Sequence, residues 1–532
     1  MNGAVAHVVI GICAIAVGLL WWWGQSRVQA LRGKVGGVGR NGGVGGTGGV
    51  GGVGRNGGIK RQGSIDSRWA TSADVRPLVV DGPVPGRLLV GSLETPFSKH
   101  LGRRAGRLVA TEKNHSVMVI GPTQSYKTSG FAIPAILEWE GPVVAVSVKA
   151  DLVSKTFEWR RQRGETWVFD PTWATDYACD GWSPLGECNT WVGARRMAKS
   201  LSGFGHKTGL SDSEFWYSAA AKLLAPLLYA ASISRGTMSD VLRWVDTQET
   251  NEVQAILEHA GCGEALQSVQ ASWSRDPRQR SSIYTTLETV LEAFGDPGVG
   301  SVSPSAGIEV NRLVDGSSST LYICSAAHEQ QRLRPLFCAM LEQLLRSAFD
   351  CANMQGGRLY SPLLLVIDEA ANIAPIPNLD AVASTAASHG IQLVTVWQDL
   401  AQVNARYRES AYSVVNNHRA KVFLSGISDK ETLEYVSRLA GDRSLHGRST
   451  SSDSRGGKST TWQPSRELLA TPSSIRQMPP GSGILVYGHL PPARVLLRPW
   501  YRERTLIDRA GAGAGAQAGA QAGAQTGAQA LT

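Results

Sequence analysis

The chain has 532 residues, of which 53 are Lys or Arg and 44 are Asp or Glu, so its formal net charge is +9 at pH 7. A hydrophobic content of 42% excludes a globally disordered chain, and the length predicts roughly two to four domains. Residues 1–65 hold seven basic and no acidic residues, which leaves 46 basic against 44 acidic residues elsewhere. Net charge therefore gives no argument that the folded part binds nucleic acid. The seven cysteines are scattered and are typical of reduced, cytoplasmic thiols.

An apolar segment at the N-terminus predicts a membrane anchor over residues 1–24. The twenty residues AVAHVVIGICAIAVGLLWWW (4–23) carry no formal charge, and a helix of this length spans the hydrocarbon layer of about 30 Å. A cleaved signal peptide is the alternative, but no basic residue precedes the run and it ends in three tryptophans. Because all the flanking positive charge follows the run, we expect a single-pass protein of the cell membrane with a cytoplasmic body.

Two segments of low complexity flank the part that we expect to fold. Residues 33–58 contain fifteen glycines and repeat VGRNGG at 38–43 and 53–58, so residues 25–68 are predicted to be a flexible, basic linker. Residues 510–532 (AGAGAGAQAGAQAGAQTGAQALT) carry no charge and are predicted to be a disordered tail. The folded part is expected over about 69–509.

A strand, a polar loop and a helix start follow one another at 116–137. The apolar run SVMVI (116–120) leads into GPTQSYKTSG (121–130) and then FAIPAIL, the context that a phosphate-binding loop requires. In such a loop backbone N–H groups bind phosphate oxygens, a lysine reaches the outer phosphates and a hydroxyl ligates magnesium. The predicted nucleotide-binding residues are Gly121, Pro122, Thr123, Gln124, Ser125, Tyr126, Lys127 and Thr128. A polar turn that caps a helix is the alternative, because Tyr126 stands where the pattern has glycine.

Two further apolar strands end in polar residues that complete this site. SPLLLVIDEA (361–370) ends in two carboxylates, of which Asp368 is expected to hold magnesium with Thr128, and Glu369 to orient or deprotonate the attacking water. A helix cap is the alternative for the acidic pair. GIQLVTVWQ (390–398) ends in Gln398, which can sense or position the terminal phosphate. The three strands together predict hydrolysis of a nucleoside triphosphate, with Glu369, Lys127 and Gln398 as the catalytic residues.

The remaining pattern predicts an α/β fold with a helical insertion. Further apolar strands lie at 141–148, 166–171, 319–325 and 421–427, and they alternate with helical stretches as in a doubly wound parallel sheet. From 191 to 305 the pattern is helical, with segments at 213–232, 239–258 and 280–294. We therefore expect a nucleotide-binding domain in two parts, 69–190 and 306–509, with an all-α domain at 191–305. The polar stretch 447–467 is expected to form an exposed loop or flexible hairpin.

These segments resemble the type IV secretion coupling proteins, the conjugative DNA transfer family of TraG/TraD type with a TraM-recognition-like region. The matching blocks are GPTQSYKTSG (121–130), SVKADL (147–152), FDP (169–171), WSPL (182–185), FWYSAAAKLLAPLL (215–228), RLRPLF (332–337), LLLVIDEAANI (363–373), SHGIQLVTVWQDLAQ (388–402) and VVNNHRAKVFLSGISD (414–429). The resemblance implies a membrane-anchored, hexameric ATPase with a RecA-like P-loop NTPase domain, using ATP and Mg²⁺. It also implies that a relaxase-bound, single-stranded DNA is recruited and passed to the channel proteins of a secretion system.

The chain departs from that family pattern in three respects. The family commonly has a pair of transmembrane helices, whereas this chain shows one apolar segment, and Tyr126 replaces the loop glycine. Family members often place an arginine shortly before the glycine that is Gly390 here, where this chain has Ala-Ser-His. The weak substitutes for that arginine are Arg406, Arg408 and Arg419, which are otherwise surface charges.

The sequence leaves alternatives open for the DNA contact and for the function. The basic run RDPRQR (275–280) is a candidate for contact with DNA or substrate, or simply a solvated helix start. A septal double-stranded DNA pump of FtsK type would share the sheet and the ring, but the helical insertion favours the coupling family. A receptor that docks secretion substrates without hydrolysis, disabled by Tyr126, is the other alternative.

Overall fold

The computed structural model describes residues 66–94, 106–203, 211–302, 307–373, 376–452 and 458–511, which all belong to one compact unit beginning at Ile65. The predicted anchor at 4–23, nearly all of the glycine-rich linker and the tail after Gly511 lie outside the described residues. Within the described ranges, no helix has the length and apolar character needed to cross a membrane.

Seven parallel strands form the centre of the sheet, and each coincides with one of the apolar runs that predicted a strand. In spatial order they are β10 (Ala420–Leu424), β4 (Val117–Ile120), β9 (Ile391–Trp397), β8 (Leu363–Ile367), β5 (Val143–Ser147), β7 (Thr320–Cys324) and β6 (Thr166–Phe169). Every residue of these strands except the first two of β6 is buried, because helices cover both faces.

The expectation of a purely parallel sheet is wrong on one side. Five antiparallel strands continue the sheet beyond β10, giving twelve strands in all. In order outward they are β13 (Ser482–Tyr487), β14 (Ala493–Leu496), β2 (Leu89–Leu93), β3 (Leu108–Ala110) and β1 (Val79–Val80). These strands come from the two ends of the folded chain, so short connections within each end allow antiparallel pairing.

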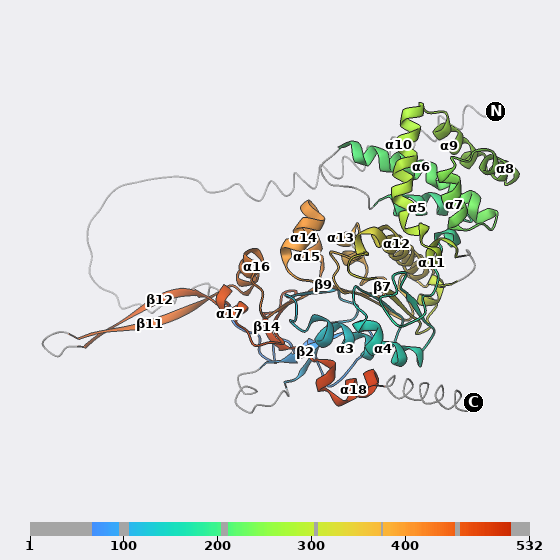
Figure 1. Ribbon diagram of the computed structural model, residues 1–532. Helices are drawn as coiled ribbons and strands as arrows, with labels where there is room; N and C mark the ends of the chain where they lie inside the picture. Colours follow the sequence, from blue (N-terminus) through green and yellow to red (C-terminus); the bar gives the residue numbers. More distant parts are fainter. Residues whose placement is uncertain are drawn as a thin grey trace, which may run out of the picture. The chain divides into compact units, whose positions relative to one another are not determined.

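The two faces of the sheet build two separate cores. Along β4, Val117 and Val119 pack with the helices on one face, while Met118 and Ile120 pack on the other, as the two-residue period of a strand requires. Figure 1 shows α3, α4 and α18 on the first face and α12 to α15 on the second. The bounds of these helices are α3 (Ile133–Glu138), α4 (Asp151–Arg161), α18 (Arg504–Gly511), α12 (Gln330–Met354), α13 (Leu379–Thr385), α14 (Leu400–Tyr407) and α15 (Ala411–Asn417).

A group of helices is inserted between β6 and β7, within the range 191–305. Its members are α5 (Trp191–Ser202), α6 (Ser211–Ile233), α7 (Met238–Asp246), α8 (Asn251–His259), α9 (Gly263–Trp273), α10 (Pro277–Leu291) and α11 (Pro297–Gly300). α6 lies at the centre of this group, with Leu223, Leu224, Leu227 and Leu228 buried, and its core is continuous with the core around α12. In the basic run 275–280, Asp276 accepts hydrogen bonds from the backbone N–H groups of Arg278 and Gln279 and so caps the start of α10.

The polar stretch at 447–467 lies within a two-stranded antiparallel ribbon, so the hairpin alternative is the one that the structure adopts. β11 (Asp442–Ser452) and β12 (Lys458–Leu468) pair over eleven residue pairs, and Figure 1 shows the ribbon extending from the neighbourhood of α16 (Lys430–Ala440) and α17 (Pro472–Arg476).

The C-terminal segment fastens the helix that follows the phosphate loop. Arg498 is only 8% exposed and donates to both carboxylate oxygens of Glu138, at 2.9 and 2.8 Å, and also to Glu503. Its backbone N–H donates to the carbonyl of Gly130 at 3.3 Å. Gly130 lies near the start and Glu138 at the end of the helical stretch 128–138 that follows the loop. The C-terminal segment therefore bonds to both ends of this stretch.

A second buried arginine ties the same helix to the sheet. The Arg160 guanidinium donates to the carbonyl oxygens of Trp139, Gly141 and Ser318 at 2.6 to 3.0 Å, and to the Thr320 hydroxyl at 2.8 Å. Burial lowers the pKa of Arg160 to about 10. The end of α3 and the starts of β5 and β7 therefore share one cation.

Replacement of this cation is expected to destabilise the fold severely. Arg160→Ala leaves buried carbonyl groups without hydrogen-bond donors and creates a cavity, so the free energy of unfolding should fall by about 3 kcal/mol or more. The adjacent Arg161 is exposed and pairs with Glu158 at 2.9 Å, so Arg161→Ala should change the free energy of unfolding by less than about 0.5 kcal/mol. Urea denaturation of both variants measures the difference, and equal losses would contradict the assignment.

Candidate nucleotide-binding site

The ends of three neighbouring strands define the site. All seven central strands run in one direction, so the loops that follow β4, β9 and β8 open at the same edge of the sheet. β9 lies between the other two, and the Gly121 N–H donates to the carbonyl of Trp397 at 3.1 Å. This edge is where parallel sheets place their ligands.

The loop after β4 is tightly closed and depends on a glycine. A Cβ on Gly121 would lie 2.6 Å from the Ser125 hydroxyl oxygen and 2.8 Å from the Cβ of Leu424, so no side chain fits there. The Ser125 hydroxyl donates to the carbonyl of Pro122 at 2.7 Å and closes the loop on itself. Thr123 and Gln124 are exposed at its tip.

The ammonium of Lys127 lies inside this loop. Its Nζ donates to the carbonyl oxygens of Gly121 and Pro122 at 2.6 and 2.5 Å. Burial lowers the pKa of Lys127, and the nearby carboxylates of Asp368 and Glu369 oppose that shift. A cation held in a loop at the start of a helix matches the outer phosphates of a nucleotide.

A hydrogen bond joins the loop to the acidic strand. The Thr128 hydroxyl, at the start of the helical segment η2 (Thr128–Ala132), donates to the Asp368 carboxylate at 2.8 Å. Asp368 is 4% exposed, and burial raises its pKa to about 6, against the lowering effect of the Thr128 bond. A hydroxyl beside a buried carboxylate offers the hard oxygen ligands that Mg²⁺ prefers, and a divalent cation would compensate the buried charge, so the donor set fits this metal.

The remaining predicted residues lie at the same edge. Glu369 follows Asp368 with a φ of 64°, and its charge acts on both Lys127 and Asp368. Gln398 follows the end of β9, and its backbone N–H donates to the side chain of Gln402 at 3.0 Å. Sequence reasoning did not assign Lys149 to the site. This lysine follows β5, and its charge opposes the rise in the pKa of Asp368 that burial causes. Its position in the block SVKADL, directly after a predicted strand, is the sequence signal that could have assigned it to the site.

The three arginines named as substitutes for a family arginine do not join the loop. Arg419 precedes β10, at the edge opposite to Gly121, and its guanidinium lies 5.9 Å from the centre of the Tyr487 ring. Arg406 lies near Arg334 and lowers its pKa, and Arg408 is exposed. Among the described residues, no ion pair or hydrogen bond links any of the three to residues 121–128.

Tyr126 adopts the backbone conformation of the glycine that it replaces. Its φ is 67°, a left-handed value that costs an L side chain free energy. Its ring is half-buried against the C-terminal segment, with the Arg502 guanidinium 5.7 Å from the ring centre, and a Cβ on Gly481 would lie 3.6 Å from the ring. Packing of the ring therefore offsets part of the backbone cost.

Comparison with known proteins gives one consistent group. The family model described as type IV secretory system conjugative DNA transfer matches residues 85–521. The chain is 25% identical over 402 residues to the conjugal transfer protein TraG of Escherichia coli, covering 68% of this chain and 61% of TraG. It is 22% identical over 408 residues to the protein VirD4 of Rhizobium radiobacter, covering 74% of this chain and 58% of VirD4. The matches thus span less than two thirds of these relatives.

Solved structures of the bacterial conjugative coupling protein TrwB share the fold. Unbound TrwBdeltaN70 matches with a TM-score of 0.58 at 20% identity, covering 79% of this chain and 95% of that chain. TrwB bound to a non-hydrolysable ATP analogue matches with a TM-score of 0.57 at 19% identity, and TrwB with ADP and Mg²⁺ with 0.55 at 19%. The coverage of TrwB is 96% in both.

The backbone cost at residue 126 can be separated from the contacts of the ring. Tyr126→Gly and Tyr126→Ala remove the same ring, but only alanine keeps a Cβ at a φ of 67°. The glycine variant should therefore be more stable by about 1 kcal/mol, measured by urea denaturation. Equal stability of the two variants would show that the loop relaxes without strain.

Proposed function

Because the chain belongs to the type IV secretory system conjugative DNA transfer family, we propose that it is an ATP-hydrolysing coupling protein. It recruits a relaxase-bound DNA strand and drives its transfer through the channel of a conjugative secretion system. The observation that carries the hydrolytic part is the 2.8 Å contact between Thr128 and Asp368, which brings a phosphate loop and an acidic strand end into one site.

In this proposal the cofactors are ATP and Mg²⁺, and each residue of the site has a role. The choice of cofactors is supported by the ATP analogue, ADP and Mg²⁺ of the TrwB structures. Backbone N–H groups of residues 123–128 and the Lys127 ammonium bind the phosphates, and the Thr128 and Asp368 oxygens hold the metal. Mg²⁺, when bound, neutralises charge on the phosphate oxygens. Glu369 accepts the proton of the attacking water and Gln398 positions that water or the terminal phosphate.

The assembly and its location are also part of the proposal. We place the segment 4–23 in the cell membrane as a single helix and the remainder in the cytoplasm, since the basic residues of 27–61 follow the apolar run. A homo-hexamer is proposed from the resemblance to the coupling family. A ring of RecA-like domains around single-stranded DNA would track phosphates without reading bases.

A non-hydrolysing docking receptor is the competing function, and the left-handed backbone of Tyr126 is the observation that favours it. Measured turnover by the unmodified protein separates the two. We expect a working but slow ATPase, because Lys127, Thr128, Asp368 and Glu369 stay within one connected site.

Two variants should separate nucleotide binding from chemistry. Lys127→Ala removes the ammonium from the loop and should weaken ATP binding, by roughly tenfold or more. Glu369→Gln keeps the shape of the side chain but removes the base, so it should retain ATP binding and lower turnover by at least about a hundredfold. ATP hydrolysis and nucleotide binding are measured on the full-length protein, with and without single-stranded and duplex DNA.

An exposed arginine in the same protein provides the control. Arg76→Gln changes an exposed charge just before β1 and should hydrolyse ATP at the parent rate. Parent-like turnover by Glu369→Gln would show that this carboxylate is not the base. Stimulation by duplex DNA alone would favour the FtsK-type alternative.

The membrane topology can be tested in cells stripped of their wall. With residues 24–532 inside, an external protease should leave the body intact until the membrane is permeabilised, because the positive charge that follows the apolar run keeps that side in the cytoplasm. Immunoblotting with an antibody against the region 69–509 measures the protection. Cleavage before permeabilisation would reverse the proposed orientation.

A further inference from the structure

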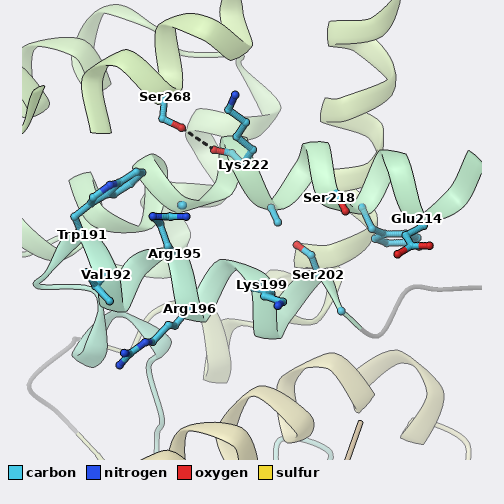
Figure 2. Close-up of a pocket in the computed structure, with 14 residues that line it drawn as sticks. Trp191, Val192, Arg195, Arg196, Lys199, Ser202, Glu214, Ser218, Lys222 and Ser268 are labelled. Carbon is cyan, nitrogen blue, oxygen red and sulfur yellow. Dashed lines mark hydrogen bonds between the residues drawn. The ribbon is translucent and has the colours of Figure 1, made fainter. Parts of the chain in front are cut away.

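The inserted helices contain a cavity of about 830 Å³ between α5, α6 and α9. Its volume falls within the range of about 300–1,000 Å³ that is typical of sites for compact ligands. On α5 the lining follows the helical spacing 192, 195, 196 and 199, and on α6 it follows 214, 217, 218, 221 and 222. Figure 2 shows Arg195, Arg196 and Lys199 along one helix, with Lys222 on the neighbouring helix.

The cavity carries unbalanced positive charge. Four cations line it, namely Arg195, Arg196, Lys199 and Lys222, against the single carboxylate of Glu214. Figure 2 places Glu214 at the end opposite to Trp191. Within the part of the chain that the structure describes, none of the four cations forms an ion pair or a side-chain hydrogen bond.

One arginine of the inserted helices and two of the adjoining α12 form ion pairs. Arg243 pairs with Glu252 at 2.8 Å, Arg332 with Asp296 at 2.9 Å and Arg346 with Glu187 at 3.0 Å. The four cations of the cavity have no such partner among the described residues. Like charges gathered around one cavity repel one another, so a bound anion would relieve that repulsion.

A buried hydroxyl in the same cavity lacks a partner. Ser202 lines the cavity at the end of α5 and is 2% exposed, and its hydroxyl has no hydrogen-bond partner among the described residues. A buried hydroxyl without a partner costs free energy. Figure 2 places Ser202 between the two rows of lining residues, in the wall of the cavity.

The lining favours an acidic protein segment over nucleic acid. Single strands bind where aromatic rings offer free faces for stacking along a basic track. Here the ring of Trp191 packs edge-on against Tyr229, with 6.2 Å between centres, and Tyr217 packs on the hydrophobic core. Val192, which is 54% exposed, and Ala221 add apolar surface that suits a side chain flanking carboxylates.

The flanking segments of this sequence cannot supply the acidic side chains. Residues 1–65 and 512–532 contain neither Asp nor Glu. Carboxylates also match the chemistry of the cations, since arginine binds a carboxylate through two parallel hydrogen bonds. The proposal therefore takes the acidic occupant from another molecule.

We propose that this cavity is the docking site for an acidic segment of a partner protein, held by Arg195, Lys199 and Lys222 and by the Ser202 hydroxyl. The partner rests on the proposed function, because a coupling protein must hold a component of the transfer apparatus while its nucleotide site works. The nucleotide site and the cavity lie on different elements, so binding and hydrolysis can be tested separately.

Fluorescence anisotropy of the full-length protein tests the site directly. The probe is a fluorescein-labelled peptide of Asp, Glu and Leu, compared with the same peptide carrying Asn and Gln in their place. The parent should bind the acidic peptide only, and more weakly as salt is added. The double variant Arg195→Gln, Lys199→Gln should lose roughly tenfold or more in affinity, whereas Arg235→Gln, at an exposed cation outside the cavity, should not.

A second variant tests the buried hydroxyl. Ser202→Ala should weaken peptide binding several-fold without lowering the midpoint of thermal unfolding, because the hydroxyl has no partner to lose among the described residues. ATP hydrolysis should stay at the parent level in every cavity variant, so a failed peptide experiment leaves the proposed function standing.

Three outcomes would overturn the docking site. The first is no binding of the acidic peptide, or equal binding by the parent and the double variant. The second is loss of labelled oligothymidine binding in the double variant while peptide binding is unchanged, which would assign the cavity to nucleic acid. The third is a change in the sedimentation of the double variant without peptide, which would assign the cavity to a contact with a second copy of the chain.

Discussion

The contact between Thr128 and Asp368 is the interaction on which the nucleotide site depends. It crosses β9, the strand between the two residues, and it lowers the pKa of a carboxylate whose pKa burial raises. Such a bond forms only if β4 and β8 run in the same direction and end at the same level. The register of the parallel sheet is therefore what positions the metal ligands, and a slip of one residue would turn each side chain to the other face.

The sequence predicts the central strands well because of where they lie. β8 is buried on both faces and reads as an uninterrupted apolar run before Asp368, and β9 is a mainly apolar run before Gln398. Two of the antiparallel strands carry no such signal: β1 has two residues and β14 alternates buried with half-buried positions. The site residues follow from strand ends, whereas Lys149 was missed because one lysine after a strand is common and only proximity to Asp368 distinguishes it.

The C-terminal segment explains how a tyrosine is accommodated in the phosphate loop. Arg498 bonds to Gly130 and to Glu138, and Arg502 lies over the Tyr126 ring. The loop is thus supported from outside by residues distant in sequence, which no local pattern could reveal. A left-handed residue persists where its surroundings fix it, and here the packing of one ring and one buried ion pair provides that fixation.

The place of the helical insertion separates recognition from chemistry. The chain leaves the sheet after β6, the outermost strand on that side, and returns at β7, its neighbour. Between β7 and the strands that carry Asp368 and Gln398 lies β5, so helices can be added at this edge without altering the register at the nucleotide site. Because the core of the insertion is continuous with that of α12, the helices are nevertheless packed on the sheet rather than tethered to it. A partner that binds the insertion would therefore contact helices whose hydrophobic core also supports the parallel strands.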